Sequence, residues 1–131
     1  FLYFLFSFCI LGGFGMSIVS KSWLLTFPVD AGFTHERIRD ILAGIKSIKY
    51  WCMCDEISSQ GILHTHVFIF SSSCIDFDAL RPFFPFAHFE RLNGGCALGR
   101  KYVAKQGLFK NFIDKEVHLS DTFEEFGEIA E

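Results

Sequence analysis

The sequence predicts an α+β fold with a central antiparallel five-stranded sheet and helices packed mainly on one face. The chain has 131 residues, half of them hydrophobic, which suits one domain with a buried core and excludes an intrinsically disordered chain. The strands predicted in the middle of the chain are joined by links of hairpin length. Such links are too short for a parallel crossover, so these strands must pair antiparallel.

The first two elements are a strand and a helix. The apolar run at residues 22–27 (SWLLTF) predicts a buried strand that ends at Pro28. Thr34 is suited to begin a helix as its N-cap. The apolar residues that follow are spaced at i, i+3, i+4 and i+7 and form one stripe: Ile38, Ile41, Leu42 and Ile45.

Two alternating strands with a polar turn at residues 58–61 come next. Residues 49–57 alternate as a strand does, which places Cys52, Cys54 and Glu56 on one face. Residues 64–70 (HTHVFIF) give the clearest strand, with His64 and His66 on one face. The two strands are expected to form a hairpin.

The remaining predicted elements are shorter. Residues 76–81 suit one helical turn that stops at Pro82, and residues 87–92 suit a strand. Residues 97–105 have weak helical character and are followed by Gly107. A last strand is expected at residues 109–113, which gives the order βαββ(α)βαβ.

The charge is divided unevenly along the chain. The formal net charge is −3, but residues 111–131 carry seven acids and one base, which leaves +3 for residues 1–110. We therefore expect one domain at residues 20–113 and an acidic tail or linker at residues 114–131. Residues 1–19 are expected to be an apolar leader of doubtful origin. The apolar stretch at residues 1–14 of this leader is shorter than the about 20 residues that a membrane helix needs, so no membrane partner is expected.

The five cysteines are odd in number and have no paired spacing, which is not typical of a secreted disulfide framework. Reduced, mostly buried thiols are the better interpretation. The sequence therefore predicts an intracellular protein.

Glu56, His64 and His66 are candidate metal ligands. Two histidines at i and i+2 on a strand point the same way, and a hairpin partner can bring Glu56 beside them. Two imidazoles and one carboxylate suit a catalytic divalent ion with open positions. Two alternatives remain: a histidine pair without a metal, and a closed zinc site that adds Cys52 and Cys54.

Tyr102 and Lys105 are the second candidate pair. On a helix, residues at i and i+3 share a face, so the phenol and the ammonium group can contact one substrate. Tyrosine is a poor nucleophile at neutral pH unless nearby positive charge favours the phenolate. An amphipathic helix with a half-buried tyrosine is the alternative.

In order along the chain, these motifs resemble the HUH endonuclease domain of rolling-circle replication initiators, in particular the replication-associated proteins of circular single-stranded DNA viruses and related plasmids. The resemblance runs from about residue 20 to residue 112. Its segments are SWLLTF, CDEISSQGILHTHVFIF and GRKYVAKQG. Thr65 stands where the family has a bulky hydrophobic residue, and the Gly-x₄-Gly-Lys-Ser/Thr motif of a helicase domain is missing from these 131 residues.

The resemblance implies a ferredoxin-like or RRM-like fold and a specific chemistry. Glu56, His64 and His66 would hold Mg²⁺ or Mn²⁺. Tyr102 would attack single-stranded origin DNA at a stem-loop, leaving a 5′-phosphotyrosine link and a free 3′-OH, while Lys105 would orient the phosphate or the tyrosine. The reverse attack would rejoin the strands.

The resemblance also implies partners and a location. A helicase domain or host replication proteins would be partners, and oligomerisation would be compatible with the family. The location would be the host nucleus for a eukaryotic virus, or the cytoplasm for a bacterial plasmid or phage.

Contacts to DNA beyond the site are expected from basic residues. Arg100 and Lys101 flank Tyr102, and Lys21 lies near the first strand. Exposed phenylalanines among residues 83–89 could stack on bases, although a packed core explains most of them better. Two other functions remain open: a non-catalytic nucleic-acid-binding sheet domain, and a transposase or relaxase of the wider HUH group.

Overall fold

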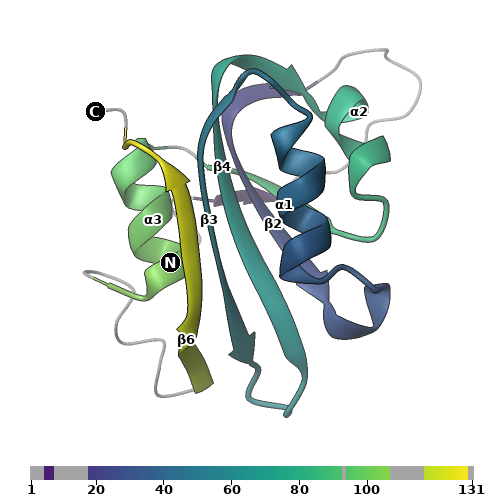
Figure 1. Ribbon diagram of the computed structural model, residues 1–131, viewed down its shortest axis with the longest axis vertical. Coiled ribbons are helices and arrows are strands. Elements are labelled where there is room, and N and C mark those ends of the chain that lie inside the picture. Colours follow the sequence, from purple (N-terminus) through teal and green to yellow (C-terminus); the bar gives the residue numbers. More distant parts are fainter. Residues whose placement is uncertain (1–4, 8–17, 93, 107–116, 130–131) are drawn as a thin grey trace.

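The computed structural model describes residues 5–7, 18–92, 94–106 and 117–129. Within them, six strands form one antiparallel sheet in the order β1-β5-β2-β4-β3-β6, accompanied by three α-helices (Figure 1). The predicted α+β class and the antiparallel central sheet are thereby confirmed. The strands are β1 (Leu5–Ser7), β2 (Val19–Pro28), β3 (Ile48–Ile57), β4 (Leu63–Asp76), β5 (His88–Leu92) and β6 (Val117–Gly127). The helices are α1 (His35–Ala43), α2 (Phe77–Leu80) and α3 (Cys96–Ala104), with 3₁₀ turns at Val29–Ala31 and Arg81–Phe83.

The elements in the middle of the chain form where the sequence predicts them. Thr34 caps α1, since its side chain accepts a hydrogen bond from the backbone N–H of Arg37 at 3.1 Å. β3 and β4 pair through the predicted hairpin, and β4 is longer than expected because it continues to Asp76 and pairs there with β2. The strand expected at residues 109–113 lies outside the described residues.

The sheet is covered on both faces, which corrects the expectation that the helices pack mainly on one. Neighbouring residues of β2 point to opposite faces, and four consecutive ones, residues 22–25, are all buried. Trp23 and Leu25 face the core under α1 and α2, whereas Leu24 packs with Cys96 and Val103 of α3. Because β2, β3 and β4 are apolar on both faces, each face requires a helix to exclude water.

The acidic segment at residues 114–131 is not simply a tail, because β6 forms the edge of the sheet beside β3. Its two central glutamates point to opposite faces of the sheet and contact basic side chains there. Glu124 lies 2.6 Å from Nδ1 of His35 and 2.8 Å from the guanidinium of Arg39 on α1. Glu125 accepts hydrogen bonds from Arg100 of α3 at 2.8 Å and from Tyr50 of β3 at 2.7 Å. These contacts hold β6 against α1 on one face of the sheet and α3 on the other.

The sheet also includes residues that precede the predicted domain boundary at residue 20. β2 begins at Val19, and Leu5–Ser7 of the expected leader pair with β5 as the opposite edge strand of the sheet. The described part of the leader thus supplies a sixth strand.

Candidate metal centre

The β3–β4 hairpin places the predicted ligands together. Glu56 lies directly opposite His64 in the antiparallel register, and Cys54 lies opposite His66. Because side chains alternate along a strand, His64 and His66 project from the same face as Glu56. This is the face that α3 covers.

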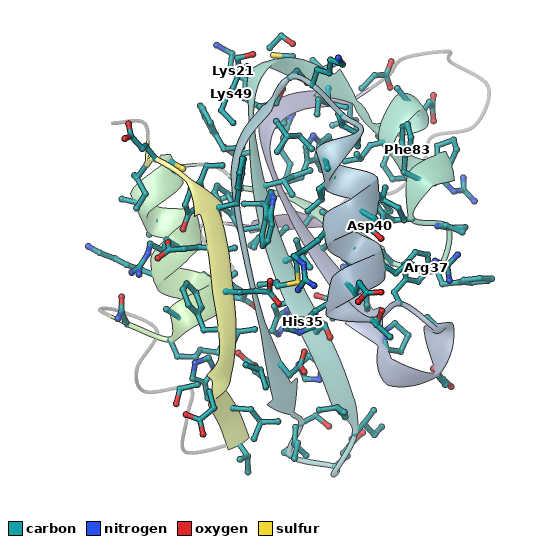
Figure 2. All side chains as sticks on the ribbon, in the orientation of Figure 1. Lys21, His35, Arg37, Asp40, Lys49 and Phe83 are labelled. Atoms are coloured by element: carbon teal, nitrogen blue, oxygen red, sulfur yellow. The ribbon has the colours of Figure 1, made fainter. Side chains whose placement is uncertain are left out.

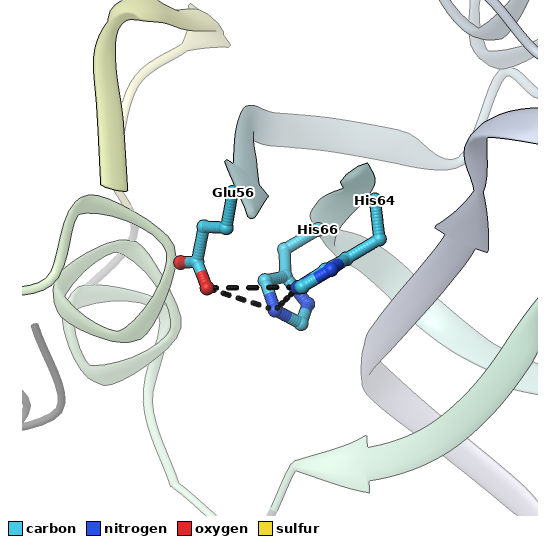
Figure 3. Close-up of side chains that lie close together, drawn as sticks. All are labelled: Glu56, His64 and His66. Atoms are coloured by element: carbon cyan, nitrogen blue, oxygen red, sulfur yellow. Dashed lines mark hydrogen bonds and ion pairs between the residues drawn. The ribbon is translucent and has the colours of Figure 1, made fainter. Parts of the chain in front are cut away.

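Three potential ligand atoms converge there (Figure 3). Oε1 of Glu56 lies 3.3 Å from Nε2 of His66 and 3.7 Å from Nε2 of His64. The two Nε2 atoms are 3.1 Å apart. All three atoms lie within 4.8 Å of one another, so the group could hold a metal ion.

The environment of the carboxylate suits a cation. The Glu56 side chain is fully buried, and neither of its oxygens accepts a hydrogen bond from the part of the chain that the structure describes. Lys105 Nζ lies 2.9 Å from Oε2 and forms an ion pair with it. Burial alone would raise the pKa of Glu56; His64, His66 and Lys105 outweigh burial, so its pKa falls well below the ordinary value. The carboxylate is therefore charged.

Each histidine is oriented by a contact at Nδ1. His64 Nδ1 donates to the backbone carbonyl of Ile62 at 3.3 Å, which leaves the lone pair on Nε2. Nδ1 of His66 lies 3.1 Å from the hydroxyl of Thr26 in β2. Burial lowers the pKa of His66, which favours the neutral imidazole that a metal requires.

Helix α3 brings the second predicted pair to the same place. The ring of Tyr102 packs against His66 with 5.5 Å between ring centroids, and Lys105 Nζ lies 4.1 Å from the centre of the Tyr102 ring. Lys105 ends the helix in the left-handed conformation, with φ 55°. This conformation is uncommon for a residue other than glycine, and its side chain is held in the ion pair with Glu56. Tyr102 and Lys105 thus lie next to each other, as the Tyr-x-x-Lys spacing predicts.

The other candidate ligands lie apart from this group. Asp55 faces α1, where it accepts a hydrogen bond from Thr65 and lies 2.7 Å from His35. Cys54 contacts β6 rather than His64 or His66, with its thiol 3.2 Å from the carbonyl of Leu119. Burial raises the pKa of Cys52 to about 12. Cys52 is not part of the described group that could hold a metal ion. The described residues therefore do not support the closed zinc alternative.

The three basic residues expected at DNA differ in their surroundings. Lys101 is exposed on α3, one residue before Tyr102. Arg100 is engaged in the pair with Glu125 and lies over the ring of Phe123. Lys21 lies at the end of β2 away from the hairpin turn (Figure 2), because it is Pro28 at the other end of the strand that pairs with His64. Of the three, Arg100 and Lys101 lie on α3, the helix that carries Tyr102.

His118 of β6 is a site residue that sequence reasoning missed. It lies opposite Glu56 in the β3–β6 register, with Nδ1 3.4 Å from Oε2 of Glu56. Its segment is rich in acids, which indicated a solvated tail. The sequence does not indicate that His118 lies beside Glu56, because the two residues are 62 positions apart and spacing does not predict pairing between such distant strands.

The fold and the centre define an α+β domain with a candidate site of two histidines and one carboxylate. Comparison of the sequence with protein-family models and with curated proteins found no match. Among the residues described, no helix has both the length and the apolar character required to cross a membrane.

Proposed function

We propose that this chain is the nuclease domain of an HUH endonuclease that nicks and rejoins single-stranded origin DNA. One observation carries the proposal: Tyr102 and Lys105 of α3 pack against His66 and Glu56 of the candidate metal centre. A tyrosine, a lysine and a two-histidine, one-carboxylate group from three elements are the parts that a phosphotyrosine mechanism requires.

The proposed ion is Mg²⁺ or Mn²⁺, held by Glu56, His64 and His66. Carboxylate and water ligands suit both Mg²⁺ and Mn²⁺, and the open positions of the group leave room for water and a phosphate oxygen. A divalent ion bound there would polarise the scissile phosphate and stabilise charge on its oxygens. Thr26 and the carbonyl of Ile62 hold the two imidazoles in the orientation that this binding needs.

Tyr102 is the proposed nucleophile. Its phenolic oxygen forms a bond to phosphorus while the bond from phosphorus to the 3′ oxygen breaks. The proton that leaves the phenol is balanced by the one taken up at the new 3′-OH. The number of phosphodiester bonds is unchanged, so attack by a 3′-OH on the phosphotyrosine rejoins the strand.

The charges of the site favour a substrate that is an anion. Lys105 already neutralises Glu56, so the two positive charges of a divalent ion would have no counter-charge among these residues. A phosphodiester and a tyrosinate supply one negative charge each. Buried charges of one sign are costly unless they are compensated, which makes this combination favourable.

An apolar groove beside His64 suits an unpaired base next to the scissile phosphate. Its volume is about 440 Å³, and none of its lining residues is acidic: Thr26, Pro28, Ser58, Ile62, His64, Phe86 and His88. Phe86 is 67% exposed there, whereas Phe84 and Phe89 are buried in the core. Stacking on an aromatic ring stabilises a single strand by about 1–3 kcal/mol per base.

A cleavage assay tests the proposal. A panel of labelled stem-loop oligonucleotides is incubated with the protein and Mn²⁺, and a shortened product with a free 3′-OH is expected for at least one of them. Tyr102→Phe should bind the same oligonucleotide without cutting it. A non-catalytic binding domain would bind in both forms and cut in neither, which would overturn the proposal.

A further inference from the structure

The two oxygens of the Glu56 carboxylate have different surroundings. Oε1 faces the Nε2 atoms of His64 and His66. Oε2 faces away from them, 2.9 Å from Lys105 Nζ and 3.4 Å from Nδ1 of His118. We infer that His118 is a positioning residue that, with Lys105, holds Oε2 so that Oε1 alone is presented to a metal ion. The inference rests on the proposed function because it assigns a role toward the proposed ion.

The position of His118 follows from the edge strand. β6 pairs with β3 so that His118 is the direct neighbour of Glu56, and neighbouring residues in an antiparallel register share a face. The irregular register between Met53 and Asp55 separates this part of the strand pair from the part that holds Glu124 and Glu125. The His118 side chain is only 8% exposed, so β6 closes the site on the side of Oε2.

Cys54 and Glu56 both contact the His118 ring. The thiol of Cys54 lies 3.9 Å from Nδ1 and 3.7 Å from Nε2 of His118, and Nδ1 lies 3.4 Å from Oε2 of Glu56. Cys54 is fixed in turn, since its thiol donates to the carbonyl of Leu119 at 3.2 Å. These contacts give the ring a defined orientation.

A carboxylate held at one oxygen binds a metal better than a free one, because less side-chain freedom is lost on binding. Loss of a group that orients a metal ligand commonly weakens metal affinity about 10–100-fold. His118 shares its task with Lys105, so we expect the lower end of this range.

The test compares Mn²⁺ affinity, measured by calorimetric titration, in the wild type and three variants of the full chain. His118→Leu removes the nitrogen and is expected to weaken Mn²⁺ binding roughly tenfold. His118→Asn places an amide nitrogen near the position of Nδ1 and should restore most of the affinity. Leu119→Ala, at the next position of β6, is the matched control and should bind as the wild type does.

The outcomes distinguish the role of His118 from the existence of the metal centre. Equal affinity in the wild type and a folded His118→Leu, or an equal loss in Leu119→Ala, would overturn the role of His118 and leave the metal centre standing. Failure of His118→Asn to restore binding would overturn the contact through Nδ1. Lack of Mn²⁺ binding by the wild type would overturn the proposed metal centre and this inference with it.

Discussion

Lys105 Nζ lies 2.9 Å from Oε2 of Glu56, and the side chains are only 2% and 0% exposed. A charge at such a site is costly unless an opposite charge compensates it. Lys105, the last residue of the Tyr-x-x-Lys motif, thus compensates the charge of Glu56, the first residue of the motif that contains His64 and His66. The pair joins the helix that holds the proposed nucleophile to the strand that holds the proposed metal ligand.

Replacement of Lys105 should destabilise the protein more than removal of the whole pair. Lys105→Met leaves Glu56 as an uncompensated buried charge, which typically costs about 3–5 kcal/mol of unfolding free energy. The double variant Glu56→Gln/Lys105→Met should lose less. Urea unfolding in the presence of a metal chelator measures both. An unfolding free energy of Lys105→Met within about 1 kcal/mol of the wild-type value would contradict this account of the pair.

Gly99 allows α3 to lie close to the sheet. A Cβ atom at this position would stand 2.3 Å from ring carbons of Phe68, which is buried in β4. Gly99→Ala should therefore push the helix outward and cost about 1–3 kcal/mol, despite the better helix propensity of alanine. Cleavage should also fall, since Tyr102 lies one turn further along α3.

Gly95→Ala is the matched control for this variant, because no atom lies within 4 Å of a Cβ at Gly95. It should lose less unfolding free energy than Gly99→Ala in the same urea titration. Equal losses of unfolding free energy in the two variants would indicate that the close contact between Gly99 and Phe68 is not what destabilises Gly99→Ala.

The stability of the β6 edge should depend on acid pH through Glu124. Burial alone would raise the pKa of Glu124, but His35 and Arg39 outweigh burial and lower its pKa below the ordinary 4.5. A carboxyl group whose pKa is lower in the folded state binds fewer protons there than when unfolded. Its stabilising contribution is thus complete above about pH 4.5 and is lost as the pH falls through the folded-state value.

Glu124→Gln removes this dependence. Urea unfolding from pH 7 to pH 3 should show a difference between the wild type and Glu124→Gln that shrinks below pH 4.5. A difference that stays constant with pH would show that the charge of Glu124 does not tie β6 to α1.

The sequence was sufficient for the parts of the site that depend on local structure. Alternation along β3 and β4, with a short turn between them, determines that Glu56, His64 and His66 share a face. Tyr102 and Lys105 lie together at the end of α3, where Lys105 follows the helix in the left-handed conformation. Both relationships involve residues that are close in the chain.

The parts that the sequence did not reveal depend on distant residues. Acidic side chains dominated the segment that forms β6, and the residues that contact these side chains lie on two different helices: His35 and Arg39 on α1 and Arg100 on α3. His118 reaches Glu56 only because this strand pairs with β3. The ion pair of Lys105 with Glu56 joins residues 49 positions apart, which helix periodicity alone does not predict.

The most direct measurement is a test for a covalent bond between Tyr102 and DNA. The wild type is incubated with Mn²⁺ and a stem-loop oligonucleotide that it cleaves, and the products are separated under denaturing conditions and digested for mass spectrometry. We predict a protein–oligonucleotide adduct whose 5′ phosphate is attached to the peptide containing Tyr102. The adduct should be missing in folded Tyr102→Phe and His66→Ala. An adduct that persists in Tyr102→Phe, or none with any stem-loop substrate, would contradict the proposed mechanism.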